Sequence, residues 1–183
     1  MATVRFDEKK MRELIVYIAH RQADDPTFGK VKLAKLLFYS DFEAYARLGA
    51  PITGATYQKL PQGPAARQYM PIERILVNEG AIREEAVPVG KFTQYRVVAD
   101  RDPHPAMFSN DELVIIDCVI DEHEGMTGTQ ISRKSHREVG WQVVAMEETI
   151  PYSSYLVSRA TTSPELLQAA REVAAEHGWL RAA

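Results

Sequence analysis

The stretch from Lys30 to Leu48 constrains the fold of this chain more than any other part of the sequence. Its apolar residues recur at the three- and four-residue spacing that stacks side chains along a helix. One face contains Ala34, Phe38, Phe42, Tyr45 and Leu48, and a second face beside it contains Leu33, Leu36, Leu37, Ser40 and Ala44. A helix that is apolar around most of its circumference is normally surrounded by other elements. The sequence therefore predicts a central buried helix, with Leu37 in the core.

This helix leaves a narrow polar stripe for water or a partner. The stripe contains Lys35, Tyr39, Glu43 and Arg47, each four residues from the last. Gly49 is suited to the left-handed position just past a helix end. Residues 56–60 then read as extended chain, and Pro61-Gln62-Gly63-Pro64 interrupts it. The sequence therefore predicts a helix followed by a short strand and a tight turn.

The remaining elements are mostly helical. Asp7 caps a predicted first helix, and capping boxes begin two later helices at Ser109 and Thr127. Further helices are expected over 67–79, over 136–147 and from Ser163 onward, and a β-hairpin over 81–98. These patterns predict a mainly α fold with a small β-hairpin or sheet (α+β), compact and built around the central helix. Residues 1–160 are expected to form the domain, and residues 161–183 a C-terminal helix packed on it.

Composition narrows the classes of function. Among 183 residues the net charge is −3, so no overall field attracts the chain to nucleic acid. The single cysteine, Cys118, forms no internal disulfide, which suits a reducing cytoplasm. Its helix is apolar, so we expect a buried, inert thiol. No stretch is long and apolar enough to span a bilayer, and the N-terminus does not read as a signal peptide. We therefore expect a cytoplasmic protein without membrane association.

No catalytic or cofactor motif is present. The densest run of metal-ligating residues is 121–124, with Asp117 one turn earlier, but neighbours on a helix point in different directions. A solvated helix end is the preferred interpretation, and a metal site is the alternative. The sequence contains no P-loop, no dinucleotide glycine pattern and no nucleophile elbow. We expect no metal, no cofactor and no enzymatic activity.

Four blocks between Leu14 and Tyr155 resemble the SocA-like antitoxin, or Panacea, family. The first block is the run KLAKLLFYSDFEAYARLGAPITG, followed by Tyr57 and the turn at 61–64; residues 108–113, 126–127 and 135–141 follow in the family's order. The residues that match its motif and are expected to be structural are Asp41, Pro61, Gly63, Pro64, His136 and Trp141. We expect Asp41 to lock the segment from Tyr57 to Pro64 onto the helix, and direct contact with a partner is the alternative. Gln62 and Ala65-Ala66 depart from the family's usual turn.

The resemblance implies a function in a toxin–antitoxin system. The chain would neutralise a cognate protein toxin by direct binding, as a member of a family associated with prophages. The predicted partner-binding residues are Lys35, Tyr39, Glu43, Arg47, Tyr57 and Gln62. Alternatively, the toxin binds the hairpin or the C-terminal helix, and the stripe simply faces water.

A winged-helix-like regulator that binds the DNA of its own operon is the second hypothesis. It would use the helix over 67–79 and the hairpin, although acidic residues offset the basic ones there. A homodimer is compatible with either function.

Overall fold

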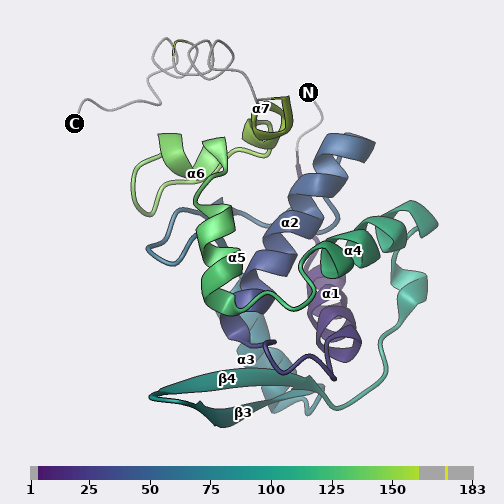
Figure 1. The fold of residues 1–183 in the computed structure, drawn as a ribbon. Helices are drawn as coiled ribbons and strands as arrows, with labels where there is room; N and C mark the ends of the chain where they lie inside the picture. Colours follow the sequence, from purple (N-terminus) through teal and green to yellow (C-terminus); the bar gives the residue numbers. More distant parts are fainter. Residues whose placement is uncertain (1–3, 161–171, 173–183) are drawn as a thin grey trace.

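The fold is built around one long helix that other elements surround on most sides. The structure, a computed structural model, describes residues 4–160 and residue 172. In Figure 1, α2 (Lys30–Leu48) lies in the middle, with α1 (Glu8–Arg21), α4 (Asn110–Glu122) and α5 (Gly128–Ser135) packed around it. Every residue from Lys32 to Ala44 is buried. The predicted central helix is therefore confirmed, and Leu37 lies in the core with 1% of its surface exposed.

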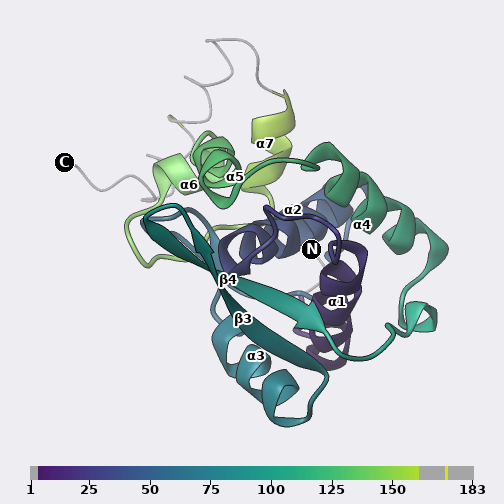
Figure 2. The same cartoon turned by 60° about the horizontal axis from the view of Figure 1, so that its bottom comes forward.

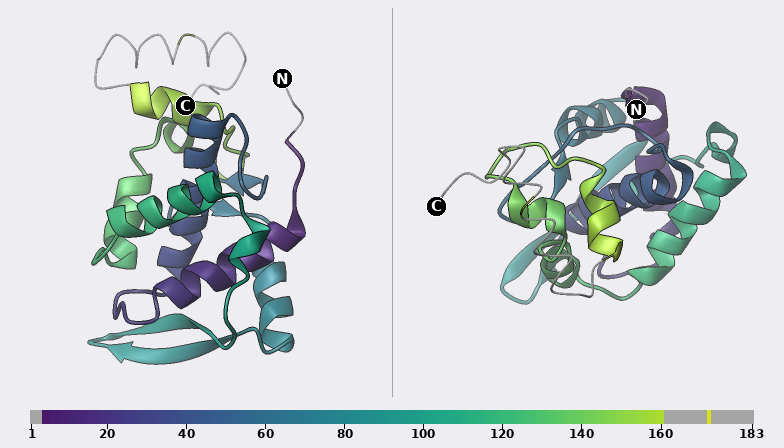
Figure 3. Two further views of the ribbon diagram at one scale, coloured as in Figure 1. Left: turned by 90° about the vertical axis from the view of Figure 1, so that its right-hand side faces the viewer. Right: turned by 90° about the horizontal axis from the view of Figure 1, so that it is seen from above.

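The first helix crosses beneath the central one, as the side view in Figure 3 shows. Asp7 caps it by accepting a hydrogen bond from the backbone N–H of Lys10 at 3.0 Å. The buried residues of α1 run continuously from Glu13 to Ala19. Such burial exceeds a single amphipathic face, because α2, α3 (Tyr69–Asn78) and strand β4 (Phe92–Ala99) all contact this helix. α1 therefore forms a second layer of the core.

Two small antiparallel sheets complete the mainly α fold. Strands β1 (Tyr57–Gln58) and β2 (Ala65–Ala66) flank the turn after α2. Strands β3 (Ile82–Val89) and β4 (Phe92–Ala99) form the predicted hairpin. Their residues pair without interruption, from Ile82 opposite Ala99 to Val89 opposite Phe92. Figure 2 shows this hairpin beside α3 (Tyr69–Asn78) and the start of α2. The predicted α+β class is confirmed.

Local capping signals set the helices of the second half. Ser109 and Glu112 form a capping box at α4, and Thr127 and Gln130 form another at α5. A short 3-10 helix, η1 (Pro105–Met107), precedes α4. α6 covers only Val139–Val143, much less than the helix expected over 136–147, and α7 follows at Ser154–Ala160. The expected helix from Ser163 onward lies outside the described residues, so the predicted domain limits stay predictions.

The prediction of a buried Cys118 is wrong, because the thiol-bearing residue is exposed. The buried face of α4 consists of Ile115, Ile116, Val119 and Ile120. Residues two positions apart do not share a helical face, so Cys118 points away from the side on which Ile116 is buried.

Among the described residues, no helix is both long and apolar enough to cross a membrane.

Candidate partner interface

A buried carboxylate on α2 holds the segment that follows the helix. Asp41 is fully buried and accepts hydrogen bonds from the backbone N–H of Thr53 at 2.6 Å, from the Thr53 hydroxyl, and from the Tyr57 hydroxyl at 2.8 Å. Burial raises the pKa of Asp41 to about 6, although the bonds from Thr53 and Tyr57 oppose that rise. The bond to Tyr57 joins Asp41 to the first residue of the segment from Tyr57 to Pro64.

Side chains from three helices fix the turn at 61–64. The ammonium of Lys35 on α2 donates to the carbonyl of Pro64 at 2.9 Å. The hydroxyl of Ser132 on α5 donates to the carbonyl of Gln62 at 2.6 Å, and the indole of Trp141 on α6 donates to that of Leu60 at 3.2 Å. These bonds engage three backbone carbonyls in and next to the turn, and the N–H of Gly63 donates to the carbonyl of Leu60 at 2.9 Å. The turn is therefore held as a rigid feature whose tip, Pro61-Gln62, is exposed.

Gly63 is required at the buried side of this turn. Its φ is +97°, a conformation that side chains other than glycine rarely adopt. A Cβ placed there would lie 2.4 Å from the Ser135 hydroxyl and 2.7 Å from Cε of Lys35. Only glycine therefore lets α2 and α5 close on the turn.

Cationic groups surround the buried side of the turn. Burial lowers the pKa of Lys35 to about 8. Lys59 donates to the carbonyl of Val144 at 3.0 Å and lies 4.5 Å from the centre of the Trp141 ring. In the part of the chain that the structure describes, neither lysine forms an ion pair with a carboxylate.

His136 and Trp141 pack against each other. Their rings stack at a centroid distance of 4.0 Å, and His136 also ends α5. Burial lowers the pKa of His136, and the nearby charges of Lys35 and Lys59 lower it further. Nε2 of His136 has no hydrogen-bond partner within the described residues. This arrangement favours a neutral ring with a packing role.

The prediction that the polar stripe on α2 is exposed is wrong for three of its four residues. Lys35, Tyr39 and Glu43 are 2%, 3% and 6% exposed, and only Arg47 lies at the surface. Each buried side chain has a local reason. Lys35 reaches the Pro64 carbonyl, Tyr39 stacks on His123 with the ring centres 4.6 Å apart, and Glu43 pairs with Arg47 and with Arg159 of α7. The stripe is covered because α4, α5 and α7 all pack against α2.

Of the other predicted partner-binding residues, Tyr57 is also buried, with 1% of its surface exposed, and Gln62 is exposed. Sequence reasoning missed Thr53, Ser132 and Tyr152 as supports of this region. Tyr152 donates to the carbonyl of Ala55 at 2.7 Å across 97 positions of sequence. No local signal marks such a pair. Ser132 and Ser135 are three positions apart on one face of α5, and this spacing was a usable signal that their hydroxyls act together.

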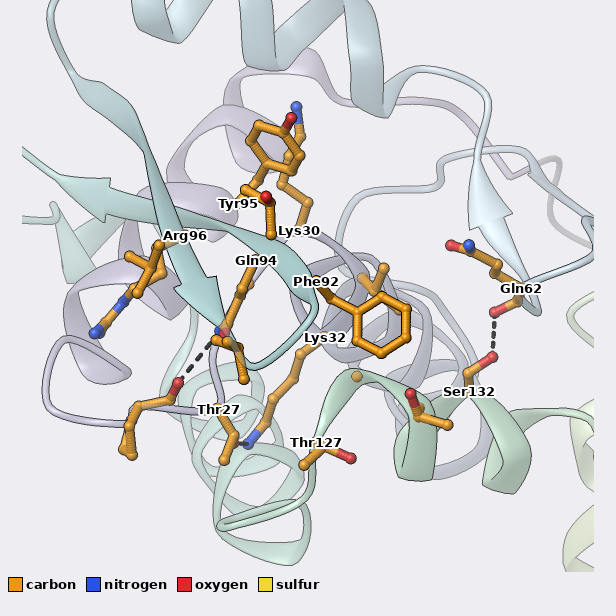
Figure 4. Close-up of a pocket in the computed structure, with 18 of the residues that line it drawn as sticks. Thr27, Lys30, Lys32, Gln62, Phe92, Gln94, Tyr95, Arg96, Thr127 and Ser132 are labelled. Carbon is orange, nitrogen blue, oxygen red and sulfur yellow. Dashed lines mark hydrogen bonds between the residues drawn. The ribbon is translucent and has the colours of Figure 1, made fainter.

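The exposed tip of the turn borders a groove. Figure 4 shows Gln62 and Ser132 on one side of it and Phe92 of the hairpin facing them. The groove has a volume of about 830 Å³ and lies between the turn, the hairpin and the first residues of α2 and α5. It adjoins both the turn, which belongs to the predicted partner surface, and the hairpin, which is one of the two alternative sites for the toxin.

The acidic run at the end of α4 forms no cluster of ligands. Asp121, Glu122 and Glu124 are exposed, whereas His123 is fully buried. The Nδ1–H of His123 donates to the carbonyl of Val119 at 2.7 Å, and its Nε2 accepts from Lys134 at 2.9 Å. Across residues 4–160, no three groups of the metal-ligating types converge. The three carboxylates of the run therefore lie in solvent, whereas His123 is a buried residue that packs on Tyr39.

The sequence matches the model of one known protein family over the part of the chain that contains this arrangement. The model of the family described as "Antitoxin SocA-like, Panacea domain" matches residues 33–142, which is more than half of the chain. The chain belongs to this family. The matched range of the Panacea domain contains the turn, its anchors on α2, α5 and α6, and the hairpin. Comparison with curated proteins and with solved structures found no match.

Proposed function

We propose that the chain is an antitoxin that neutralises a cognate protein toxin by forming a complex with it. Membership of the SocA-like antitoxin family carries this proposal. A cytoplasmic, prophage-associated toxin–antitoxin pair is the setting that we propose. The chain acts in it as a binding protein and not as an enzyme.

The geometry of the motif supports binding over catalysis. Asp41, Lys35, Ser132 and Trp141 direct their polar atoms at backbone or side-chain groups of the turn and its flanks. A catalytic group needs free access to a substrate, whereas these groups are used to hold a surface in place. What they present to solvent is the tip of a rigid turn beside a groove. Rigid, preformed surfaces lose little conformational entropy on association.

Of the partner-binding residues that the sequence predicts, Arg47 and Gln62 are exposed, so a partner can reach them. Arg47 lies at the exposed end of α2, and Gln62 lies at the tip of the turn. We propose Gln62 as the more direct contact, because Arg47 already pairs with Glu43.

The surface of α3 does not favour the alternative of a DNA-binding regulator. Its exposed residues include Met70, Ile75 and Val77, with Arg74 among them. A helix that enters a DNA groove normally presents a row of cationic and polar side chains. The apolar residues on α3 are more typical of a protein contact.

A co-expression experiment tests the proposed function. The gene adjacent to that of this chain is placed under an inducible promoter, and cell growth is measured with and without the chain. We expect induction to arrest growth, the chain to restore it, and the two proteins to co-elute at a fixed ratio. Light scattering on the purified chain and on the complex gives the stoichiometry and tests for a homodimer. Growth arrest that persists beside abundant soluble chain, with no complex, would refute the proposal.

A further inference from the structure

The tip of the hairpin holds apolar side chains over a space that its own chain does not fill. Val89 pairs with Phe92 in the register of the hairpin, and Val87 pairs with Gln94, so these residues share one face. That face lines the groove. Phe92 is 81% exposed and Val89 is 50% exposed. Large apolar side chains placed together at a groove mark an interaction site more often than isolated ones do.

The hairpin is fixed over the groove by contacts with the loop before α2. The amide of Gln94 donates to the carbonyl of Phe28 at 2.7 Å, and the guanidinium of Arg96 donates to that of Ala23 at 2.8 Å. Gly29 permits this approach, since a Cβ there would lie 2.9 Å from the carbonyl oxygen of Tyr95. The roof of the groove is therefore preformed.

The floor of the groove is formed where two helices begin. A Cβ added to Gly128 at the start of α5 would lie 3.2 Å from Cβ of Val31 in the first turn of α2. The N-cap of α2 is Gly29, which supplies no side-chain hydrogen bond to the free N–H groups of that turn. Val31 adds an apolar side chain to the lining of the groove, and both helix starts contribute partial positive charge.

The charged side chains that line the groove are all cations, namely Lys30, Lys32 and Arg96. Lys30 and Lys32 are paired with carboxylates of their own chain. Arg96 bonds only to backbone carbonyls, and Lys91 at the tip of the hairpin is exposed; within residues 4–160 neither forms an ion pair with a carboxylate. Carboxylates of a bound partner would complement this side of the groove.

We propose that this groove binds a segment of the toxin that carries an apolar side chain flanked by carboxylates. The apolar side chain lies between Phe92 and Val31, and the carboxylates face Arg96 and Lys91. A protein segment fits better than a small molecule, because small-molecule sites enclose most of the ligand, whereas the aromatic roof here is 81% exposed. The inference rests on the proposed antitoxin function and assigns the surface that performs it.

Variants on opposite walls of the groove test the proposal. Phe92→Asp removes the apolar side chain above the groove and places a carboxylate there, which repels the carboxylates expected on the partner. Thr129→Trp fills the groove from the exposed start of α5. Val114→Asp is the matched control, because Val114 is 58% exposed on α4, outside the groove. Lys91→Glu tests the charge, with Lys9→Glu on α1 as its control. Thermal unfolding first confirms that every variant is folded.

The readouts are growth rescue and the Kd of the complex with the co-expressed product of the adjacent gene. For Phe92→Asp and Thr129→Trp we expect rescue to fail and Kd to rise at least ~30-fold, as at an interface hot spot. Lys91→Glu should slow association, most strongly at low salt. Val114→Asp and Lys9→Glu should bind as the unchanged chain does.

The outcomes separate this inference from the proposed function. Normal rescue and Kd in both groove variants, beside a functional unchanged chain, would overturn the groove assignment and leave the antitoxin function standing. Failure of the unchanged chain to rescue growth or bind would overturn both. Native mass spectrometry that finds a stoichiometric small molecule, displaced by Thr129→Trp, would show a ligand pocket and also overturn the inference.

Discussion

Asp41→Asn should change how the stability of the protein depends on pH. The folded chain raises the pKa of Asp41 from its ordinary value of 3.8 to about 6, because the carboxyl is fully buried. Between these two pH values the folded state holds a proton that the unfolded state has lost. The contribution of Asp41 to stability is therefore fully present below 3.8 and is lost as the pH rises through about 6.

The size of the effect follows from the two pKa values. For a single group with this shift, lowering the pH from about 7.5 to about 5 adds roughly 1.4 kcal/mol to the free energy of unfolding. Asparagine does not titrate but keeps a carbonyl oxygen for the N–H of Thr53, so Asp41→Asn should lack this increment. Urea denaturation followed by circular dichroism, at both pH values and for both proteins, measures the difference. Other titrating groups cancel in that difference.

Two outcomes for the free-energy difference between the two proteins would contradict a raised pKa of Asp41. If the free-energy difference between the two proteins is the same at both pH values, Asp41 keeps an ordinary pKa and burial does not dominate. If the unchanged chain instead loses stability relative to Asp41→Asn as the pH falls, the hydrogen bonds from Thr53 and Tyr57 outweigh burial. Equal m-values for the two proteins are the control that both unfold from comparable states.

Three further substitutions have expected outcomes, each measured by urea denaturation. Leu37→Ala should cost ~2–5 kcal/mol, because Leu37 is a core residue with 1% exposure, and a loss under ~0.5 kcal/mol would contradict that placement. Lys35→Met removes the hydrogen bond to the Pro64 carbonyl, and the stability of this variant relative to the unchanged chain should fall as the pH rises from about 7 to about 10. Lys35 loses its proton at about 8 when folded but near 10.5 when unfolded, so the unchanged chain gains stability over that range; a relative stability of Lys35→Met that rises with pH would refute this. Gly63→Ala should lower the free energy of unfolding by at least ~2 kcal/mol and Gly49→Ala by about 1 kcal/mol. Both glycines have positive φ, but a Cβ meets close neighbours only at Gly63, so equal losses would show that the turn relaxes.

The elements that sequence analysis placed well are those set by neighbouring residues. The cap at Asp7 and the capping boxes at Ser109 and Thr127 depend on hydrogen bonds across three positions. The hairpin follows from Gly90 between two strand-forming runs, and Gly90 has the positive φ that such a turn needs. Local chemistry decides these features, so the sequence alone predicts them.

The exposure of the polar stripe on α2 could not be predicted in the same way. Lys35 and Glu43 were interpreted as surface residues because charged side chains are rarely buried without partners. Their partners, the Pro64 carbonyl and Arg159, are 29 and 116 positions away. Which helices cover which face depends on tertiary packing, for which a helical repeat carries no signal. The groove was missed for the same reason, since its walls come from four separate parts of the chain.

The distribution of buried and exposed residues has a consequence for partner choice. The motif residues Asp41, Gly63 and Pro64 are buried and hold the turn, so substitutions there act first on stability. Gln62 and Phe92 are exposed beside the groove and contribute little to the core, so their substitution should change stability by only about 0.5 kcal/mol. The surface that we assign to the toxin can therefore vary while the support beneath it stays fixed. On the proposed function, we expect such a scaffold to accept a different partner after a few surface changes, because its rigidity does not depend on the residues that make contact.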